Sequence, residues 1–238
     1  MFTGIVEAVG TLKALKQHGH GYEILVETPD SFRLKERVKL GDSIANNGVC
    51  LTVTRMSGNS FYADVSAETV KCTCLGNYAK GHKLNLELAC TPSTHLGGHI
   101  VQGHVDGIGT VVSRHTLDDA YDIWIKAPDE LLRYIATKGS IAVDGVSLTV
   151  NEIRQDKFRL TLIPHTQSNV NFDSFSEGNR VNLEVDVLAR YLERLLGAGF
   201  SSKTGTIGND NLKNGSSDGT NTKSSGITMS SLLKNGFI

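Results

Sequence analysis

Apolar and polar residues alternate over short stretches of this chain, which is the pattern of β-strands that bury one face. Residues 49–54 (VCLTVT) place two valines and a leucine on one side and a cysteine and two threonines on the other. Residues 146–151 (VSLTVN) repeat this arrangement. Each stretch follows a turn dipeptide, Asn47-Gly48 or Asp144-Gly145, that tolerates the positive φ of a tight hairpin. The pattern therefore predicts two hairpins of the same design.

These hairpins belong to a longer internal repeat. Residues 41–53 read GDSIANNGVCLTV and residues 138–150 read KGSIAVDGVSLTV, at an offset of 97 residues. The same offset relates Phe61 to Phe158, Thr69 to Thr166, Gly81 to Gly178, and residues 85–87 to 182–184. At the start of the chain the offset is 99, because FTGIVEAVGT (2–11) matches VQGHVDGIGT (101–110). The chain is thus a tandem duplication with a period of about 100 residues, the size of a small domain.

Several short strands within about 85 residues predict a small closed barrel or a sandwich for each half. Helical patterns are few. Residues 129–137 (DELLRYIAT) follow Pro128 and predict a short helix, and we expect a matching helix near residues 66–75. Residues 186–196 (DVLARYLERLL) predict a helix with an apolar stripe, formed by Val187, Leu188, Tyr191, Leu192, Leu195 and Leu196. The stripe either caps its own barrel or packs against copies of itself.

The domain boundaries follow from these elements. Residues 90–98 (CTPSTHLGG) are rich in turn formers and predict a linker between the halves. We expect an N-terminal barrel over 1–96, a C-terminal barrel over 97–186 and the helix over 187–199. Residues 200–238 consist largely of Ser, Gly, Asn, Thr and Lys, a composition that predicts a disordered tail.

Charge and composition narrow the classes of partner. The chain has 24 Lys and Arg against 25 Asp and Glu, so no charge excess favours nucleic acid or a membrane surface. The first residues lack the features of a secretory signal, and no window approaches the roughly 18 apolar residues of a membrane span. The four cysteines therefore predict reduced thiols and a cytoplasmic protein.

Two groups of residues could carry chemistry. The polar strand faces, Cys50 with Thr52 and Ser147 with Thr149, either face solvent or line a pocket for a polar ligand. Residues 97–106 (GGHIVQGHVD) form the other group, in which His104 and Asp106 would share a face of a strand. A metal site would need His95, His99, His104 and Asp106, whose spacing matches no standard zinc arrangement, so we expect no metal. A proton-carrier role for His104 stays open.

Four motifs in this order, MFTGIVE, NGVCLTV, GGHIVQGHVD and DGVSLTV, resemble the riboflavin synthase family over residues 1–196. The resemblance implies a mainly β protein of two tandem six-stranded Greek-key barrels with a C-terminal α-helix. It implies transfer of a four-carbon unit between two molecules of 6,7-dimethyl-8-ribityllumazine, without metal or organic cofactor. It also implies a homotrimer with the C-terminal helices in contact and the active site between barrels of neighbouring subunits. Lumazine synthase is the further partner that it suggests.

The resemblance also assigns site residues. Cys50, as a nucleophile, and His104, which would accept or steer a proton, are the preferred chemical residues. Ser147, Thr149 and Asp144 would stabilise or shuttle charge in the second pocket. Substrate contacts in the first barrel would be Gly4, Ile5, Val6, Ser43, Cys50, Leu51, Thr52, Asp64, Val65, Ser66, Ala67, Glu68 and Thr69. Those in the second would be Gly103, His104, Val105, Lys138, Ser147, Leu148, Thr149, Thr161, Leu162, Ile163, Pro164, His165 and Thr166.

Alternatives remain at this point. Cys50 could be a buried apolar thiol or could only orient a water, and Phe2 could pack over the site or serve in the core. A non-catalytic lumazine- or flavin-binding carrier is the main rival to an enzyme, but such carriers lose motif residues in one pocket. Here both halves keep Gly-x-x-Leu-Thr-Val. A flavin-dependent reductase would need a nicotinamide-binding half, for which the chain has no fingerprint.

Overall fold

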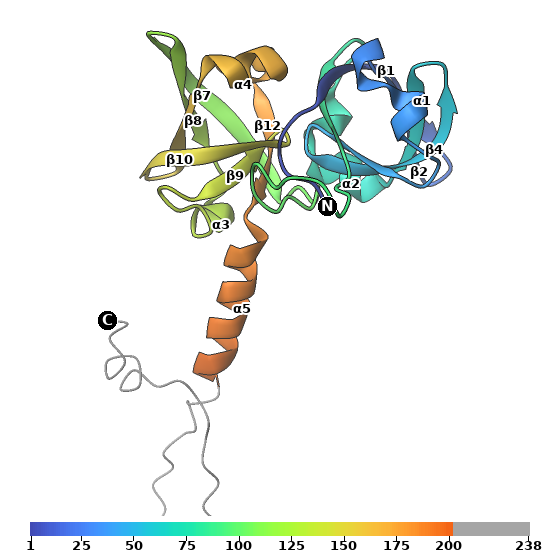
Figure 1. The fold of residues 1–238 in the computed structure, drawn as a ribbon. Coiled ribbons are helices and arrows are strands. Elements are labelled where there is room, and N and C mark those ends of the chain that lie inside the picture. The colour runs from blue at the N-terminus through green and yellow to red at the C-terminus, as the bar shows by residue number, and fades with distance from the viewer. Residues whose placement is uncertain (202–238) are drawn as a thin grey trace, which may run out of the picture. The chain divides into compact units, whose positions relative to one another are not determined.

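The structure, a computed structural model, describes residues 1–201 and contains two closed antiparallel barrels (Figure 1). The first, in the order β1-β2-β5-β4-β3-β6, comprises β1 (Ala8–His18), β2 (Gly21–Glu27), β3 (Ser43–Asn46), β4 (Val49–Ser57), β5 (Ser60–Val65) and β6 (Lys83–Leu88). The second, in the order β10-β11-β8-β7-β12-β9, comprises β7 (Gly107–Leu117), β8 (Ala120–Lys126), β9 (Ser140–Val143), β10 (Val146–Arg154), β11 (Lys157–Leu162) and β12 (Arg180–Val185). The predicted duplication of six-stranded barrels is confirmed.

Alternation along β4 and β10 sorts side chains as predicted. Val49, Leu51 and Val53 are buried in the core of the first barrel, and their counterparts in β10 are buried in the second. Asn47 and Asp144 both have a φ of 45°, and the following glycines have φ of 78° and 77°. Positive φ at both turn positions matches the right-handed twist of the flanking strands, which is why these dipeptides close the β3–β4 and β9–β10 hairpins.

The short helices of the two halves correspond to one another by their positions in the repeat, and not in the way that the sequence patterns predicted. They are α1 (Leu34–Arg37), α2 (Ala67–Cys72), α3 (Asp129–Leu132) and α4 (Pro164–Asn169), with 3-10 turns at Asp30–Phe32, Cys74–Asn77 and Phe172–Phe175. α4 is the counterpart of α2, and α3 that of α1, so the proposed match between residues 129–137 and 66–75 is wrong. α3 also ends five residues early, because the chain turns there and buries Leu131 and Ile135 in the barrel core.

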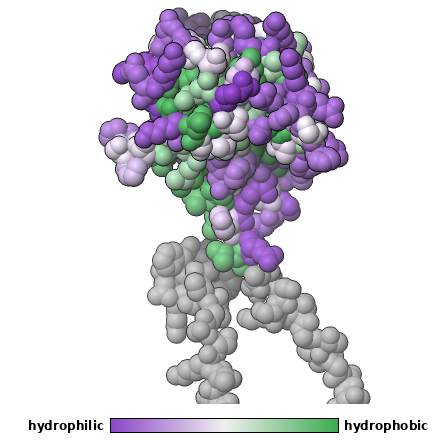
Figure 2. Space-filling view, turned by 90° about the vertical axis from the view of Figure 1, so that its right-hand side faces the viewer, coloured by the Kyte–Doolittle hydropathy of each residue, from purple (hydrophilic) through white to green (hydrophobic). Residues whose placement is uncertain are grey.

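The last described helix, α5 (Val187–Ser201), leaves its apolar stripe uncovered (Figure 2). Exposed fractions lie between 55% and 70% for Leu188, Tyr191, Leu192, Leu195 and Leu196. The helix is tied to the second barrel near its start, where Arg190 donates to Asp106 at 2.5 Å. α5 therefore does not cap its own barrel with this face. Within residues 1–201 no helix is both long and apolar enough to cross a membrane. The predicted tail falls almost wholly outside the described residues.

The two barrels meet at their matching hairpin turns. A Cβ placed on Gly48 would lie 2.8 Å from the Gly145 nitrogen, and one on Gly145 would lie 2.7 Å from the Gly48 nitrogen. Asn85 and Asn182 close the contact reciprocally. The Asn85 amide donates to the Asp144 carbonyl at 2.9 Å, and the Asn182 amide donates to the Asn47 carbonyl at 2.8 Å. Glycine at both turns is thus required by the close approach of two backbones.

The N-terminal residues pair with the linker between the barrels. Phe2 and Val101 form an isolated antiparallel bridge with bonds of 2.6 and 3.1 Å. Phe2 is fully buried in a small cluster with Ala45, Val101 and Ala142, against which Cys50 packs. The core role considered for Phe2 is therefore correct, and the side chain also lies beside Cys50.

Candidate functional site

A row of polar side chains crosses three strands of each barrel at equivalent places. In the first barrel Ser43 on β3 pairs with Thr52 on β4. Val53 pairs with Ala63 on β5, and because the two strands are antiparallel, the preceding residue Thr52 lies opposite the following residue Asp64. Because partners opposite one another share a sheet face, these three residues form one row, called here the first polar row. The second polar row consists of the counterparts Ser140, Thr149 and Thr161, set by the equivalent register of β9, β10 and β11.

Each polar row is continued by a backbone segment from the other half of the chain. The Ser147 N–H donates to the Gly4 carbonyl at 2.8 Å, and the Cys50 N–H donates to the Gly103 carbonyl at 2.9 Å. Val6 packs on the core of the second barrel, and Val105 packs on that of the first. Gly4 and Val6 thus lie against the second barrel, and Gly103 and Val105 lie against the first.

Two buried glutamates hold these crossing segments in place. The Glu87 carboxylate accepts from the Thr3 N–H at 2.6 Å, the Thr3 hydroxyl at 2.7 Å and the Gly4 N–H at 3.0 Å. Its counterpart Glu184 accepts from the Gln102 N–H at 2.6 Å and the Gly103 N–H at 3.0 Å. Burial raises the pKa of both groups, that of Glu184 to about 7, against the lowering effect of these hydrogen bonds. Both carboxyl groups therefore hold the backbone of the crossing segments in place.

The two central residues of the site have different side-chain surroundings. Ser147 Oγ lies 2.7 Å from His99 Nδ1, so the serine is paired with a buried imidazole. Cys50 is a free, half-buried thiol beside Phe2, and no side-chain hydrogen bond to its sulfur occurs within residues 1–201. His99 has no counterpart in the first half, because position 99 precedes the matched segment. This contact was missed by the sequence pattern, which considered His99 only as a metal ligand.

The segment around His104 is not a strand, contrary to the expectation that His104 and Asp106 share a strand face. His104 is exposed next to Gly103, near Cys50 of the first barrel. Asp106 accepts instead from the Val185 N–H at 2.8 Å and from Arg190. His104 therefore lies on the crossing segment near Cys50, whereas Asp106 anchors β12 and α5.

Asp144 lies away from any ligand surface. It is 1% exposed, and its Oδ1 accepts from the Asn182 N–H at 2.8 Å in the contact between the barrels. Its counterpart Asn47 accepts equivalently from the Asn85 N–H at 2.7 Å. This location does not suit the role in charge stabilisation that we expected for Asp144, because a carboxyl without exposed surface cannot touch a substrate.

The remaining expected contacts surround the two rows. Ser66 caps α2 by accepting from the Thr69 N–H at 2.9 Å, and in the second barrel Ile163 and Pro164 begin α4. Thr161 donates to Asp122 at 2.7 Å. Leu51, Val65, Leu148 and Leu162 point into the cores, so only their backbones could contact a ligand. The exposed members of this group are Ile5, Ser66, Ala67, Glu68, Lys138, Ile163, Pro164 and His165. Ser140 was missed, although the offset of 97 from Ser43 identifies it.

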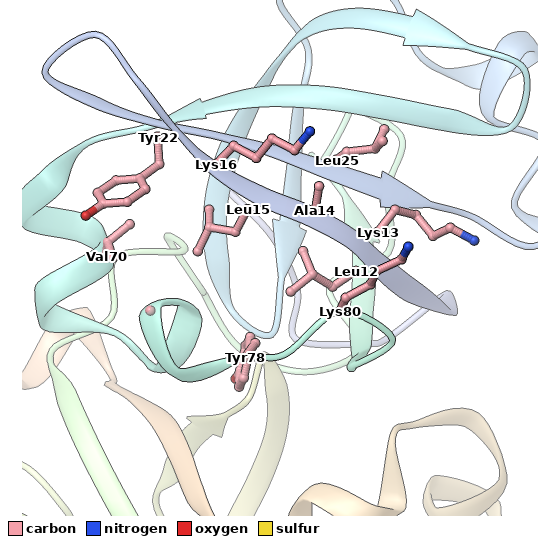
Figure 3. Close-up of a pocket in the computed structure, with 11 residues that line it drawn as sticks. Leu12, Lys13, Ala14, Leu15, Lys16, Tyr22, Leu25, Val70, Tyr78 and Lys80 are labelled. Atoms are coloured by element: carbon pink, nitrogen blue, oxygen red, sulfur yellow. The ribbon is translucent and has the colours of Figure 1, made fainter.

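Two large surface cavities lie on the first barrel, in addition to a smaller one of about 380 Å³. One, of about 840 Å³, contains Ser43 and Ile5 and is also lined by Glu87, Cys90 and His95. The other, of about 790 Å³, lies between β1, β2 and α2 (Figure 3). Figure 3 shows Leu12 and Leu15 pointing to the opposite side of β1 from Lys13 and Lys16. None of the expected ligand contacts lines this second cavity, so only the first adjoins the candidate site.

These features define a class: a protein of two tandem six-stranded barrels, each with a matched row of polar side chains. A family model described as "Lumazine binding domain" matches residues 3–89 and again residues 102–186. The chain is 50% identical over 196 residues to a riboflavin synthase of Photobacterium phosphoreum, covering 82% of this chain and 89% of that protein. It is 41% identical over 204 residues to a riboflavin synthase of Bacillus subtilis (strain 168), covering 86% and 94%.

A solved structure agrees with these relatives. LumP complexed with 6,7-dimethyl-8-(1'-D-ribityl) lumazine matches with a TM-score of 0.69 at 27% identity, covering 78% of this chain and 99% of that one. The chain therefore belongs to the riboflavin synthase family, in which the lumazine-binding domain occurs twice.

Proposed function

We propose that the protein is an enzyme that converts two molecules of 6,7-dimethyl-8-ribityllumazine into riboflavin and 5-amino-6-(D-ribitylamino)uracil. One molecule gives a four-carbon unit to the other. The two products together contain every atom of the two substrates, so the transfer needs no external oxidant, reductant or cofactor. The LumP complex supports lumazine as the ligand, because that protein shares the fold over 99% of its length.

The observation that carries the proposal is the pair of matched polar rows, each continued by a segment from the other half. Two like pockets suit a reaction between two identical molecules. Holding both reactants in register converts a bimolecular encounter into an effectively unimolecular step, which is worth up to about 7–11 kcal/mol. A carrier of a single chromophore would need only one of these rows.

The two pockets differ where the donor and the acceptor must differ. Cys50 supplies a thiol in the first pocket, with His104 in reach through the Gly103–Cys50 contact. Ser147, the counterpart of Cys50, is paired with His99 in the second pocket. Cys50 would add to the ring as a nucleophile, and His104 would move the proton of the acidic methyl group on C7. Polar side chains of the two rows would hold the ribityl hydroxyls.

The uncovered stripe of α5 supports a homotrimer with these helices in contact, since five exposed large apolar side chains lie on one helix. In that assembly, the first pocket of one subunit would face the second pocket of a neighbour. An association with lumazine synthase remains part of this proposal, because that enzyme makes the substrate.

Incubating the full chain with the lumazine is expected to produce riboflavin, measured as growth of flavin absorbance together with release of the pyrimidinedione. Because the reaction consumes two molecules for each flavin, the stoichiometry of substrate loss to flavin should be two to one. Binding of lumazine by fluorescence without conversion would favour the carrier instead, and absence of both binding and conversion would remove the function altogether.

Replacing Thr52 by valine is expected to weaken lumazine binding about 5-fold, and Thr149→Val should do the same in the second pocket. Each change removes one hydrogen bond of about 1 kcal/mol while keeping the β-branched shape. Thr54→Val is the matched control, because Thr54 lies two residues further along the same face of β4 and donates to the Tyr62 carbonyl. Equal affinities of the Thr52 and Thr54 variants, measured by fluorescence titration, would contradict the placement of the first pocket.

A further inference from the structure

The linker approaches the second barrel closely enough to fix one imidazole against Ser147. The His99 N–H donates to the Thr3 carbonyl at 3.1 Å, continuing the pairing of Phe2 with Val101. A Cβ on Gly98 would lie 2.1 Å from the Thr3 oxygen and 2.8 Å from Ser147 Cβ. Because only glycine fits there, the linker lies flat on β10 and delivers the His99 ring to Ser147.

The His99 ring is buried and has one hydrogen bond. Its exposed fraction is 8%, and Nδ1 lies 2.7 Å from Ser147 Oγ. Nε2 is inaccessible and has no hydrogen-bond partner within residues 1–201. Burial lowers the pKa of His99, so the ring is neutral at pH 7. Asp186 is the charged group that opposes this shift, yet it forms no hydrogen bond with the ring.

A neutral imidazole carries one N–H, on either Nδ1 or Nε2. Because Nε2 has no hydrogen-bond partner among the described residues, the cost of leaving it unpaired decides which nitrogen holds the proton. With the proton on Nε2, a buried N–H would lack an acceptor, and such orphaned donors are the rarest unsatisfied groups in folded proteins. With the proton on Nδ1, only a lone pair is left without a partner. In that tautomer Nδ1–H donates to Ser147 Oγ, and the serine keeps its own hydrogen for another acceptor.

We propose that His99 is a positioning residue that fixes Ser147 as a hydrogen-bond donor toward the ligand of the second pocket. The atom it would recognise is an acceptor, a carbonyl oxygen or an oxyanion of the bound ring. The ligand's identity rests on the proposed function, but the tautomer does not. The first pocket has no equivalent of the His99–Ser147 pair, because Cys50 is a weak donor and, within the described residues, no imidazole is hydrogen-bonded to its sulfur. His99 therefore distinguishes two otherwise matched pockets.

Nitrogen-15 NMR of the full, ligand-free chain tests the tautomer directly. The His99 signals, assigned by their loss in His99→Gln, are expected to show a protonated Nδ1 and an unprotonated Nε2. Most exposed histidines in water prefer the other tautomer, so a merely structural ring would not have to show this signature. Asp186→Asn should leave the tautomer unchanged. A proton on Nε2 in the unaltered protein would overturn the proposal.

A double-mutant cycle tests whether His99 acts through Ser147. His99→Leu removes the donor and is expected to weaken lumazine binding in the second pocket about 5–10-fold. His99→Asn, whose amide can still donate, should recover part of that loss. In a Ser147→Ala background, His99→Leu should cost nothing further. His20→Leu, at an exposed histidine in the turn between β1 and β2, is the control. Losses that multiply in the double variant would overturn the proposal, whereas failure of every variant, and of the unaltered chain, to bind lumazine would refute the function alone.

Discussion

Replacing Phe2 by alanine is expected to lower the free energy of unfolding by about 3–5 kcal/mol and to reduce turnover of the folded protein more than 10-fold. The first effect follows from the loss of a fully buried aromatic ring and the cavity it leaves among Ala45, Val101 and Ala142. These neighbours are small or held in strands and cannot collapse into the gap. Urea unfolding followed by fluorescence measures the change.

The second effect follows from the place of the ring. A Cβ on Gly103 would lie 2.9 Å from the Phe2 ring and 2.5 Å from Cys50 Cβ, so the ring, the crossing segment and the thiol are packed in direct contact. Removing the ring frees the segment that carries His104 and loosens the position of Cys50. Misplacement by about 1 Å can cost about 100-fold in rate.

Phe61→Ala separates the two effects. Phe61 is equally buried but lies in the core of the first barrel, so it should lose similar stability. Turnover per folded molecule, measured well below both unfolding midpoints, should stay near that of the unaltered protein. Equal turnover of the Phe2 and Phe61 variants would show that the ring serves only the core.

Local patterns sufficed for the strands and turns. Period-two alternation identified β4 and β10, and the turn dipeptides identified their hairpins, because side-chain direction and positive φ are properties of a few neighbouring residues. The offset of 97 residues then predicted that both halves share one fold. The same offset, applied to every residue, would also have identified Ser140 and the correct pairing of α3 with α1.

The contacts that each half makes with the barrel of the other half could not be predicted from such local patterns. That Gly4 would lie against Ser147 and Gly103 against Cys50 depends on how two finished barrels meet, which no local period encodes. The His99–Ser147 pair has the same origin, since it joins a linker to a strand 48 residues away. The helix expected over 129–137 ended at Leu132 because burial of Ile135 in the core outweighed its helical propensity.

Replacing Asp144 by asparagine is expected to remove the part that Asp144 contributes to a fall in stability between about pH 4 and pH 7. Burial raises the pKa of this carboxyl from 3.8 to about 7 in the folded chain. Its Oδ1 accepts from the Asn182 N–H, and Oδ2 is buried close to the Ser174 hydroxyl, which itself donates to the Asn171 carbonyl. The counterpart Asn47 instead donates to the Tyr78 hydroxyl at 2.9 Å, and the residue equivalent to Tyr78 is Phe175, which has no hydroxyl.

The direction of the effect follows from proton linkage. Below pH 3.8 both the folded and the unfolded carboxyl are protonated, so Asp144 contributes no pH dependence. Between 3.8 and about 7 the folded state binds more protons than the unfolded state, so stability falls as the pH rises. The total loss is up to about 4 kcal/mol, and it is complete above about pH 7. The amide of the Asp144→Asn variant does not titrate, so the difference in unfolding free energy between the two proteins measures this contribution.

Urea unfolding at about pH 4, 5.5 and 7.5 tests the prediction. At the lowest pH the Asp144→Asn variant should be less stable by about 1–3 kcal/mol, because its buried amide N–H₂ lacks the acceptor that the Tyr78 hydroxyl provides for Asn47. Its relative stability should then rise with pH. Glu184, whose pKa burial also raises, titrates in both proteins and cancels in the difference. Asp118→Asn, at an exposed turn, controls for the loss of one negative charge.

Adding Phe175→Tyr to Asp144→Asn would rebuild the Asn47–Tyr78 pair in the second barrel. The hydroxyl would accept from the new amide, so the deficit of Asp144→Asn at low pH should shrink if the core admits the added oxygen. The contribution of Asp144 to the pH dependence should stay absent in both variants. The prediction is wrong if the free energy of unfolding varies with pH in the same way in the unaltered protein and in Asp144→Asn. That result would mean that the Asp144 carboxyl does not titrate in this window and stays charged in the contact between the barrels.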